Sequence, residues 1–333
     1  MRLPFFAASF AAMLALAAAA PAQPAAADRD FQRAQRLDAR VATVGHRLAV
    51  ASLDLCADRQ WRWGFVVADI AALQSPYRDS ATRAFGVVAG LGVMALVAGG
   101  PAERAGLRAH DVILALDGRA PAQTGPQGPG RGTPAAADML ASLDEAFADG
   151  RALVEAGRAA ARVTIAIEAD RSCATRFQAT PSGSRRAYAD GRVVGISAAM
   201  VDYAADDAEL AAVVAHELAH NILRHRVRLD GVARGVLGIG RDTRRIRETE
   251  IEADRLSVYL MERAGYDPEA AVRFWERFGP HPLNFLRVRD HPGWRSRVQS
   301  LRTEIAEIRR ARAAGTVPIP AFARLPLPPR PAG

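Results

Sequence analysis

The spacing of apolar residues changes along the chain. Residues 28–54 place apolar side chains near one face of a helix, at Phe31, Leu37, Val41, Val44 and Leu48. From about Phe85 the pattern becomes short apolar runs punctuated by glycine, and the run over 111–118 is typical of a strand closed by a turn. The pattern therefore predicts a packing helix followed by a β-rich module.

The rest of that module and the end of the chain are predicted in the same way. Residues 120–137 are rich in Pro, Gly, Gln and Ala, which indicates a flexible loop. A helical stretch from 137 to about 148 and an alternating strand over 162–168 complete the module. The tail from Ala314 is proline-rich, so we expect it to be extended and poorly packed.

The segment His216-Glu217-Leu218-Ala219-His220 carries the strongest chemical signal, because it lies among helix-forming residues that follow an acidic start at 206–209. Residues four apart share a helical face, so both imidazoles can reach one metal ion. Glu217 then lies near the open position of the metal and can act as general base toward water. Two hydrogen-bonded core histidines are the alternative if no further ligand exists.

A catalytic zinc ion needs a third protein ligand. Leu223 and Arg226 occupy the positions where the metzincin pattern requires glycine and histidine, which excludes that class. His225 lies nine residues after His216, about 180° round a continued helix at about 3.6 residues per turn, so we expect it to be structural.

A later acidic helix supplies the third ligand. It is expected to begin at Glu248 and to run to about Ala264. Glu250 and Asp254 are four residues apart and share a face, whereas Glu252 points away. We predict that Glu250 binds the metal and that Asp254 accepts a hydrogen bond from a ligating imidazole and fixes its tautomer. The loop over 230–247, rich in Gly and Arg, is either a mobile gate or an ordinary connection.

Composition adds a compartment and limits the partners. An apolar, Ala-rich run follows Met1-Arg2, so residues 1–27 are predicted to be a cleaved signal peptide that exports the protein to the periplasm or cell envelope. Export favours a disulfide between Cys56 and Cys173 over two independent buried thiols. The formal net charge is +8 with no lysine. The arginines are dispersed, which argues against nucleic acid and leaves membrane-surface association open.

Two resemblances refine these expectations. Residues 81–170, with the run Gly99–Leu107 followed by Asp111–Gly118, resemble a PDZ domain of bacterial exported proteases. Such domains bind peptide C-termini by strand addition beside a carboxylate-binding loop, which by position falls near Phe85–Leu91. The alternative is a β-rich domain that only braces or gates the peptidase.

The second half of the chain resembles the HtpX-like and CAAX-prenyl-protease-like zinc metallopeptidases, which are gluzincins. The matching residues cover roughly 171–310 and are His216–His220, Glu250–Arg255, Ala264–Pro268, Asp290-His291-Pro292 and the later Arg297. The resemblance implies one Zn²⁺ per chain, His291 over the active site and Arg297 lining the cleft. The stretch 187–197 departs from the usual edge-strand sequence of the family.

The predicted fold class is therefore α+β: a mainly helical gluzincin core with a small edge sheet, plus a β-rich PDZ-like domain. The expected divisions are a signal peptide (1–27), a helical part of the peptidase unit (28–80), the PDZ-like domain (81–170), the zinc metallopeptidase core (171–313) and the tail (314–333). The expected function is an exported zinc metalloendopeptidase of envelope protein quality control. A scaffold or chaperone with a latent metal site and a non-proteolytic zinc hydrolase are the alternatives.

Overall fold

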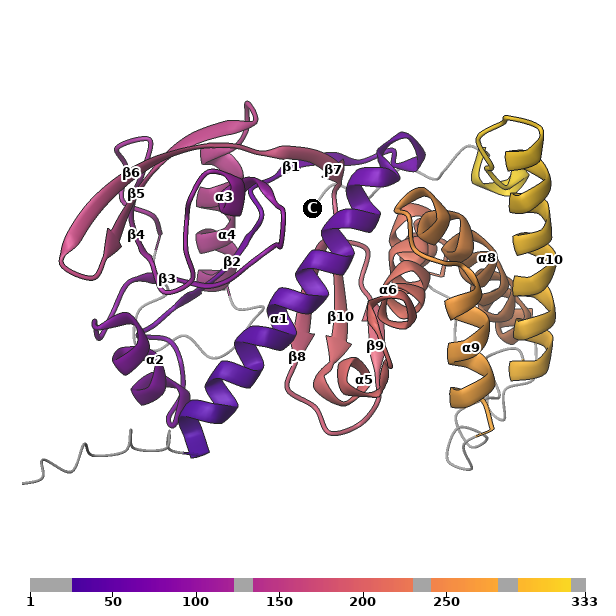
Figure 1. Cartoon of the computed structure of the whole chain (residues 1–333), viewed down its shortest axis with the longest axis horizontal. Helices are drawn as coiled ribbons and strands as arrows, with labels where there is room; N and C mark the ends of the chain where they lie inside the picture. Colours follow the sequence, from indigo (N-terminus) through magenta and orange to yellow (C-terminus); the bar gives the residue numbers. More distant parts are fainter. Residues whose placement is uncertain (1–25, 123–133, 230–240, 281–292, 325–333) are drawn as a thin grey trace, which may run out of the picture.

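The computed structural model describes residues 26–122, 134–229, 241–280 and 293–324, and every structural statement below refers to these residues (Figure 1). Most of the expected signal peptide, most of the 120–137 loop, His291 and the end of the tail lie outside them. In the part of the chain that is described, no helix combines the length and the apolar character needed to cross a membrane.

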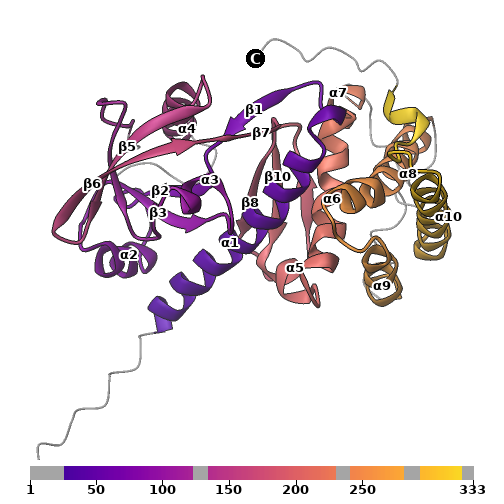
Figure 2. The same ribbon diagram turned by 45° about the horizontal axis from the view of Figure 1, so that its top comes forward.

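Helix α1 (Ala26–Ala51) lies between a β-rich lobe and a helical lobe and contacts both (Figures 1 and 2). Its buried stripe confirms the predicted helical face. Phe31 packs with Ile70 and Phe85 of the β-rich lobe, whereas Val44 and Leu48 belong to the core of the helical lobe. One helix therefore fixes the position of the two lobes.

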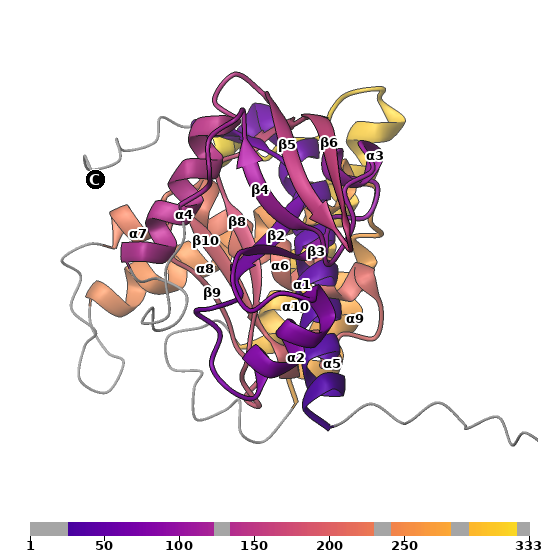
Figure 3. The same ribbon diagram turned by 90° about the vertical axis from the view of Figure 1, so that its left-hand side faces the viewer.

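An antiparallel five-stranded sheet forms the β-rich lobe. Its order is β2 (Phe65–Asp69), β3 (Leu91–Leu96), β4 (Val112–Leu116), β5 (Arg151–Arg158) and β6 (Ala161–Glu168). Leu91 and Val93 pack on the side of α3 (Pro101–Arg104) and α4 (Pro134–Ala146), and Met94 packs on the side of α1 and α2 (Tyr77–Phe85). Helices therefore cover both faces of the sheet (Figure 3).

Three expectations for this region are wrong. Residues 28–80 are not wholly helical, because they contain β1 (Arg59–Arg62) and β2, short strands rich in aromatic and β-branched residues that no helical periodicity marks. Phe85 ends α2 and does not begin a strand. The segment 85–91 leads into β3, which is paired on both sides, whereas β2 is the outermost strand. The carboxylate-binding loop expected at 85–91 is therefore misplaced.

The helical lobe packs its helices against a three-stranded sheet of order β8 (Arg176–Thr180), β10 (Val193–Ser197) and β9 (Ala187–Ala189). Strand β10 is parallel to β8 and antiparallel to β9. The helices are α5 (Ala198–Tyr203), α6 (Asp207–Ile222), α7 (His225–Arg228), α8 (Arg241–Arg263), α9 (Glu269–Phe278) and α10 (Trp294–Ala313). A short 3-10 turn, η4 (Ala321–Arg324), follows in the tail. The predicted α+β class is confirmed.

Helix α8 starts earlier than predicted. It begins at Arg241, so residues 241–247 of the proposed gate are helical, and residues 230–240 lie outside the described residues. Residues 241–245 are all polar, so no apolar periodicity marks them as helical. The predicted helix therefore started only at the acidic cluster that begins at Glu248.

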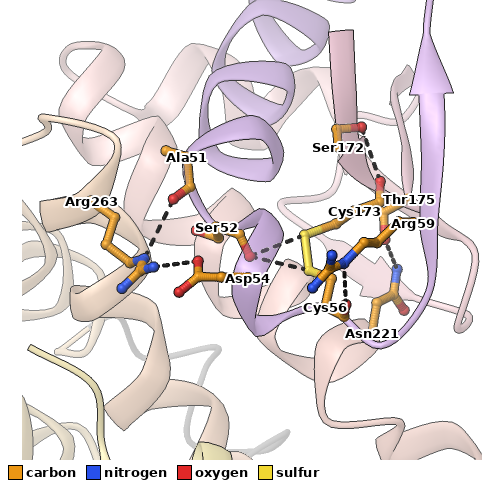
Figure 4. The surroundings of a disulfide bond; sticks show 10 residues. All are labelled: Ala51, Ser52, Asp54, Cys56, Arg59, Ser172, Cys173, Thr175, Asn221 and Arg263. Atoms are coloured by element: carbon orange, nitrogen blue, oxygen red, sulfur yellow. Dashed lines mark hydrogen bonds and ion pairs between the residues drawn. A yellow bond between two sulfur atoms is a disulfide. The ribbon is translucent and has the colours of Figure 1, made fainter. Parts of the chain in front are cut away.

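A disulfide clamps the connection between the lobes. Strand β1 pairs with β7 (Asp170–Cys173), with Arg59 opposite Cys173, and this two-stranded ribbon carries the chain into and out of the β-rich lobe. Cys56, in the turn that follows η1 (Leu53–Leu55), is bonded to Cys173 with a Cα–Cα distance of 5.4 Å (Figure 4). The bridge spans 117 residues. A loop of that length is constrained strongly in the unfolded chain, which typically contributes about 2–4 kcal/mol.

Helix α1 crosses β8 at Gly45. A Cβ atom at this position would lie 2.1 Å from Cγ of Phe177, so only glycine permits the approach. Two turns away the carboxylate of Asp38 accepts a hydrogen bond from the backbone N–H of Ala179 at 2.9 Å. This contact satisfies an outward-facing group of the edge strand β8.

We predict that Gly45→Ala destabilises the protein, although alanine usually favours a helix by about 0.5–1 kcal/mol. The new Cβ would meet Cγ of Phe177, the ring atom nearest the backbone, which cannot move away easily. Overpacking therefore costs about 1–3 kcal/mol, which outweighs that gain. Urea unfolding measures the change. Gly183→Ala, where nothing lies within 4 Å of the new Cβ, is the matched control. A stabilised Gly45→Ala variant would contradict this packing.

Candidate metal centre

The metal motif lies on a helix that is capped at its start and buried along most of its length. The side chain of Asp206 accepts a hydrogen bond from the N–H of Glu209 at 2.8 Å, and Glu209 accepts one in return from the N–H of Ala205 at 2.9 Å. The arrangement resembles a capping box, except that the N–H bound by Glu209 belongs to Ala205, the residue before the N-cap Asp206. It confirms the predicted acidic helix start. Helix α6 therefore presents its two motif histidines from a rigid element of the core.

The three predicted metal ligands lie together. The Nε2 atoms of His216 and His220 are 3.2 Å apart. Oε2 of Glu250 lies 3.3 Å from Nε2 of His216, and its Oε1 lies 3.5 Å from Nε2 of His220. Taking one ligand atom from each residue, all three lie within 4.8 Å of one another. Glu250 lies 30 residues after His220 in sequence, and the two meet only because helices α6 and α8 pack face to face.

These separations fit a metal ion. In a tetrahedral site with bonds of about 2.0–2.1 Å, neighbouring ligand atoms are about 3.3–3.4 Å apart. The nitrogen–nitrogen distance is close to that spacing. So is the distance from each nitrogen to one oxygen of Glu250, Oε2 for His216 and Oε1 for His220. Two neutral imidazoles and one carboxylate are a donor set typical of catalytic metal sites.

Glu217 is placed differently from its neighbours on α6. Its side chain is partly exposed, whereas His216 and Leu218 on either side are buried. Solvent therefore reaches Glu217, as it also reaches His220 in part, and a general base acting on water requires such access.

Asp254 holds His216 from behind the ligand triangle. Its Oδ1 lies 2.9 Å from Nδ1 of His216, the ring nitrogen that faces away from Glu250. Because a ligating Nε2 must be unprotonated, Nδ1–H donates to Asp254 and the carboxylate fixes this tautomer. Asp254 is buried and also accepts a hydrogen bond from Nε of Arg297 at 2.7 Å.

Arg297 does not lie where the family resemblance suggested. Its buried guanidinium pairs with Asp254, stacks 3.4 Å from the centre of the Trp275 ring and lies 3.4 Å from Nδ1 of His216. It therefore sits behind the ligand triangle and does not line a cleft on the metal side. The other expected catalytic residue, His291, lies outside the described residues.

His225 and Glu252 belong to the centre, which sequence reasoning missed. Nδ1 of His225 lies 2.9 Å from Nδ1 of His220, and its Nε2 lies 3.0 Å from Oε2 of Glu252. Glu252 is not part of the ligand triangle and faces His225 instead. His225 comes near His220 because α6 ends at Ile222 and the chain turns before α7, whereas the expectation extended the helix through residue 225. Arg224, which lies in the left-handed region at φ 53°, makes this turn.

The pKa values of the two motif histidines shift in opposite directions. Burial alone would lower the pKa of His216, but its hydrogen bonds to Asp254 and Glu250 outweigh burial and raise the pKa to about 10. Burial, together with the charge of His216, lowers the pKa of His220 to about 3. Burial raises the pKa of Asp254, but the charge of Arg297 and the contact with His216 outweigh it and lower the pKa. A bound cation would take the place of the His216 proton.

Two protein-family models match parts of this chain. A model for peptidase family M48 matches residues 157–240 and 242–305, and a PDZ domain model matches residues 92–142. These matches support an M48 peptidase that carries a PDZ domain. No curated protein matches it in a sequence search. The M48 match begins inside β5, although β5 and β6 pair with the PDZ strands, so the sheet extends the PDZ domain beyond the matched segment.

The M48 match includes each residue of the ligand triangle and the residues of α8 that contact them.

We predict that Asp254→Asn weakens divalent metal binding by about 10- to 100-fold, because the amide cannot match the charge-assisted hydrogen bond to His216. Competition with a chelator measures the affinity. Asp267→Asn, which removes an exposed acid paired with Arg273, serves as the control. Equal affinities for both variants would show that Asp254 does not support the site.

Proposed function

We propose that this M48 protein is an exported zinc-dependent metalloendopeptidase that hydrolyses peptide bonds of proteins in the cell envelope. The observation that carries the proposal is the meeting of ligand atoms of His216, His220 and Glu250 within 4.8 Å of one another, with the partly exposed Glu217 on the same helix as the two histidines. Two imidazoles and one carboxylate suit Zn²⁺, and the single ligand triangle among the described residues argues for one ion per chain.

Zinc, when bound, supplies a Lewis acid that polarises the scissile carbonyl and lowers the pKa of water. The residues of the chain supply the rest. Glu217 accepts a proton from the attacking water and returns it to the leaving amine. Asp254, which Arg297 holds in place, keeps a proton of His216 on Nδ1 and orients its Nε2 toward the centre of the site. The burial of the ligands excludes bulk water and strengthens the electrostatic contacts among them.

Strand β9 is proposed to align the substrate. It pairs with β10 on one side, and among the described strands none pairs with its other edge. It also packs against α6, which carries the motif. Oδ1 of Asn221, the residue after His220, accepts a hydrogen bond from the N–H of Gly191 at 2.7 Å and so fixes the β9–β10 turn. An extended peptide added to β9 would be held through its backbone, which favours a broad range of protein substrates.

The PDZ domain is proposed to select or retain substrates by their C-termini. Strand β2 is the outer strand of its sheet, and Gly64, with φ +83°, precedes it as a backbone carboxylate loop would. This placement replaces the loop expected at 85–91.

Export is supported by the Cys56–Cys173 bridge, since structural disulfides persist in oxidising compartments. A secreted peptidase with a PDZ domain suits protein quality control in the envelope, and the basic charge of the chain leaves contact with an anionic membrane surface open.

The test compares wild type with Glu217→Gln in the protein without residues 1–27. We predict unchanged zinc content and a loss of casein or peptide cleavage by about 10²- to 10⁴-fold, because the variant loses the proton acceptor and keeps every ligand. Zinc without cleavage in either protein would favour a scaffold with a latent site. Cleavage that survives in the variant would refute the role of Glu217. Hydrolysis of small esters or amides without protein cleavage would instead indicate a non-proteolytic zinc hydrolase.

A further inference from the structure

His225 makes a contact whose chemistry allows few solutions. Its Nδ1 faces Nδ1 of His220 at 2.9 Å, and the two rings meet edge to face with their centres 4.8 Å apart. Two imidazole nitrogens at this distance form a hydrogen bond only if one carries a proton and the other does not. The other nitrogen of His225 faces the carboxylate of Glu252 at 3.0 Å.

The nitrogen of His220 that faces the other two ligands decides which ring nitrogens carry protons. Nε2 of His220 faces His216 and Glu250, so metal binding needs this nitrogen unprotonated and puts the proton on Nδ1. Nδ1–H of His220 then donates to Nδ1 of His225. The proton of His225 must in turn lie on Nε2, from which it donates to Glu252. Each donor has an acceptor in this arrangement, and both rings are neutral.

We propose that Glu252 and His225 form a relay that holds His220 in its metal-binding tautomer, so that both act as positioning residues of the metal centre. The inference rests on the proposed zinc function. The relay makes the two ligating histidines equivalent: Asp254 anchors His216 directly, and Glu252 anchors His220 through an intervening imidazole. Three acids of α8, at 250, 252 and 254, therefore serve one metal site.

The backbone is built to bring His225 into this position. Arg224 adopts a left-handed conformation, which is unfavourable for a residue with a side chain. Its guanidinium is held by Asp58 at 2.9 Å, two residues from the disulfide at Cys56. This turn folds His225 back toward His220 instead of leaving it on the far side of the helix.

Burial and a further ion pair strengthen the relay. His225 is only 1% exposed, so its two nitrogens depend on protein partners. Glu252 is partly exposed and is held in turn by Arg228, whose NH2 lies 3.3 Å from its Oε1. The carboxylate is therefore fixed at the outer end, and its negative charge increases the electron-donating strength of the ligating imidazole.

The alternative is that His225 is a core histidine that merely satisfies its hydrogen bonds. The two explanations differ in their effect on metal affinity. A core residue contributes to folding whether or not the metal is bound, whereas a relay contributes to the affinity of His220 for the ion. A relay also requires that Glu252 act only through His225.

The experiment measures zinc affinity by chelator competition for wild type, His225→Phe, Glu252→Gln and the double variant. Phenylalanine keeps the ring and removes both nitrogens. Glutamine keeps the shape of Glu252 and removes its charge. We expect weakening of about 10- to 100-fold for His225→Phe and a smaller loss, about tenfold, for Glu252→Gln. The zinc affinity of the double variant should equal that of His225→Phe, because removing Glu252 has no further effect once His225 no longer connects it to His220.

Glu248→Gln is the matched control, since Glu248 is an exposed acid on the same helix paired with Arg244. Unfolding midpoints of the metal-free proteins separate packing from positioning, and the partly exposed Glu252 position keeps the test valid if His225→Phe folds poorly. In zinc-loaded wild type, nitrogen-detected imidazole NMR should show the proton on Nδ1 of His220 and on Nε2 of His225.

Unchanged zinc affinity in both single variants, additive losses in the double variant, or the opposite tautomer of His225 would overturn the relay while leaving the peptidase proposal intact. A wild-type protein that binds no zinc would instead overturn the proposed function, and the relay with it.

Discussion

Buried contacts between acids of α8 and histidines of α6 and α7 are the interaction on which the metal centre depends. A buried carboxylate is costly unless it is paired, and each acid here has a cationic or proton-donating partner. Asp254 is paired with Arg297 and His216, and Glu250 faces both motif histidines. The contacts with Asp254 and Glu250 raise the pKa of His216, so the metal-free site favours a proton on this ring. A divalent cation bound by His216, His220 and Glu250 would replace that proton.

The rest of the fold holds these helices in place and connects them to the PDZ domain. Helix α1 packs against both lobes, and the disulfide-clamped ribbon β1–β7 is their second connection (Figure 4). Asn221 extends the connection to the site, because it contacts Thr175 beside the disulfide at 3.4 Å and the β9–β10 turn through Gly191. A peptide bound by the PDZ domain would thus lie on a body rigidly joined to the edge strand proposed to align the substrate.

Sequence reasoning was strongest where one helix carries the pattern. The spacing of His216 and His220 predicted a shared face, and the four-residue step from Glu250 to Asp254 predicted a ligand with a supporting acid; the structure brings these four residues together. Reasoning failed where the chain leaves regular geometry. A left-handed residue before His225 redirects it toward the site, and no periodicity reports such a turn. Strands β1 and β2 are too short for alternation to be recognised, and their partners are distant in sequence. The position of Arg297 depends on how α10 packs, which a motif cannot specify.

X-ray absorption of the zinc-loaded protein tests the central claim most directly, because it reports the donor atoms themselves. The account predicts two imidazole nitrogens and oxygen donors at about 2.0–2.2 Å, with outer-shell imidazole scattering and no sulfur. The His216→Ala variant should lose one imidazole or the metal altogether. A spectrum without imidazole scattering, or one left unchanged by that substitution, would show that the ion lies elsewhere and that the proposed centre is not the metal site.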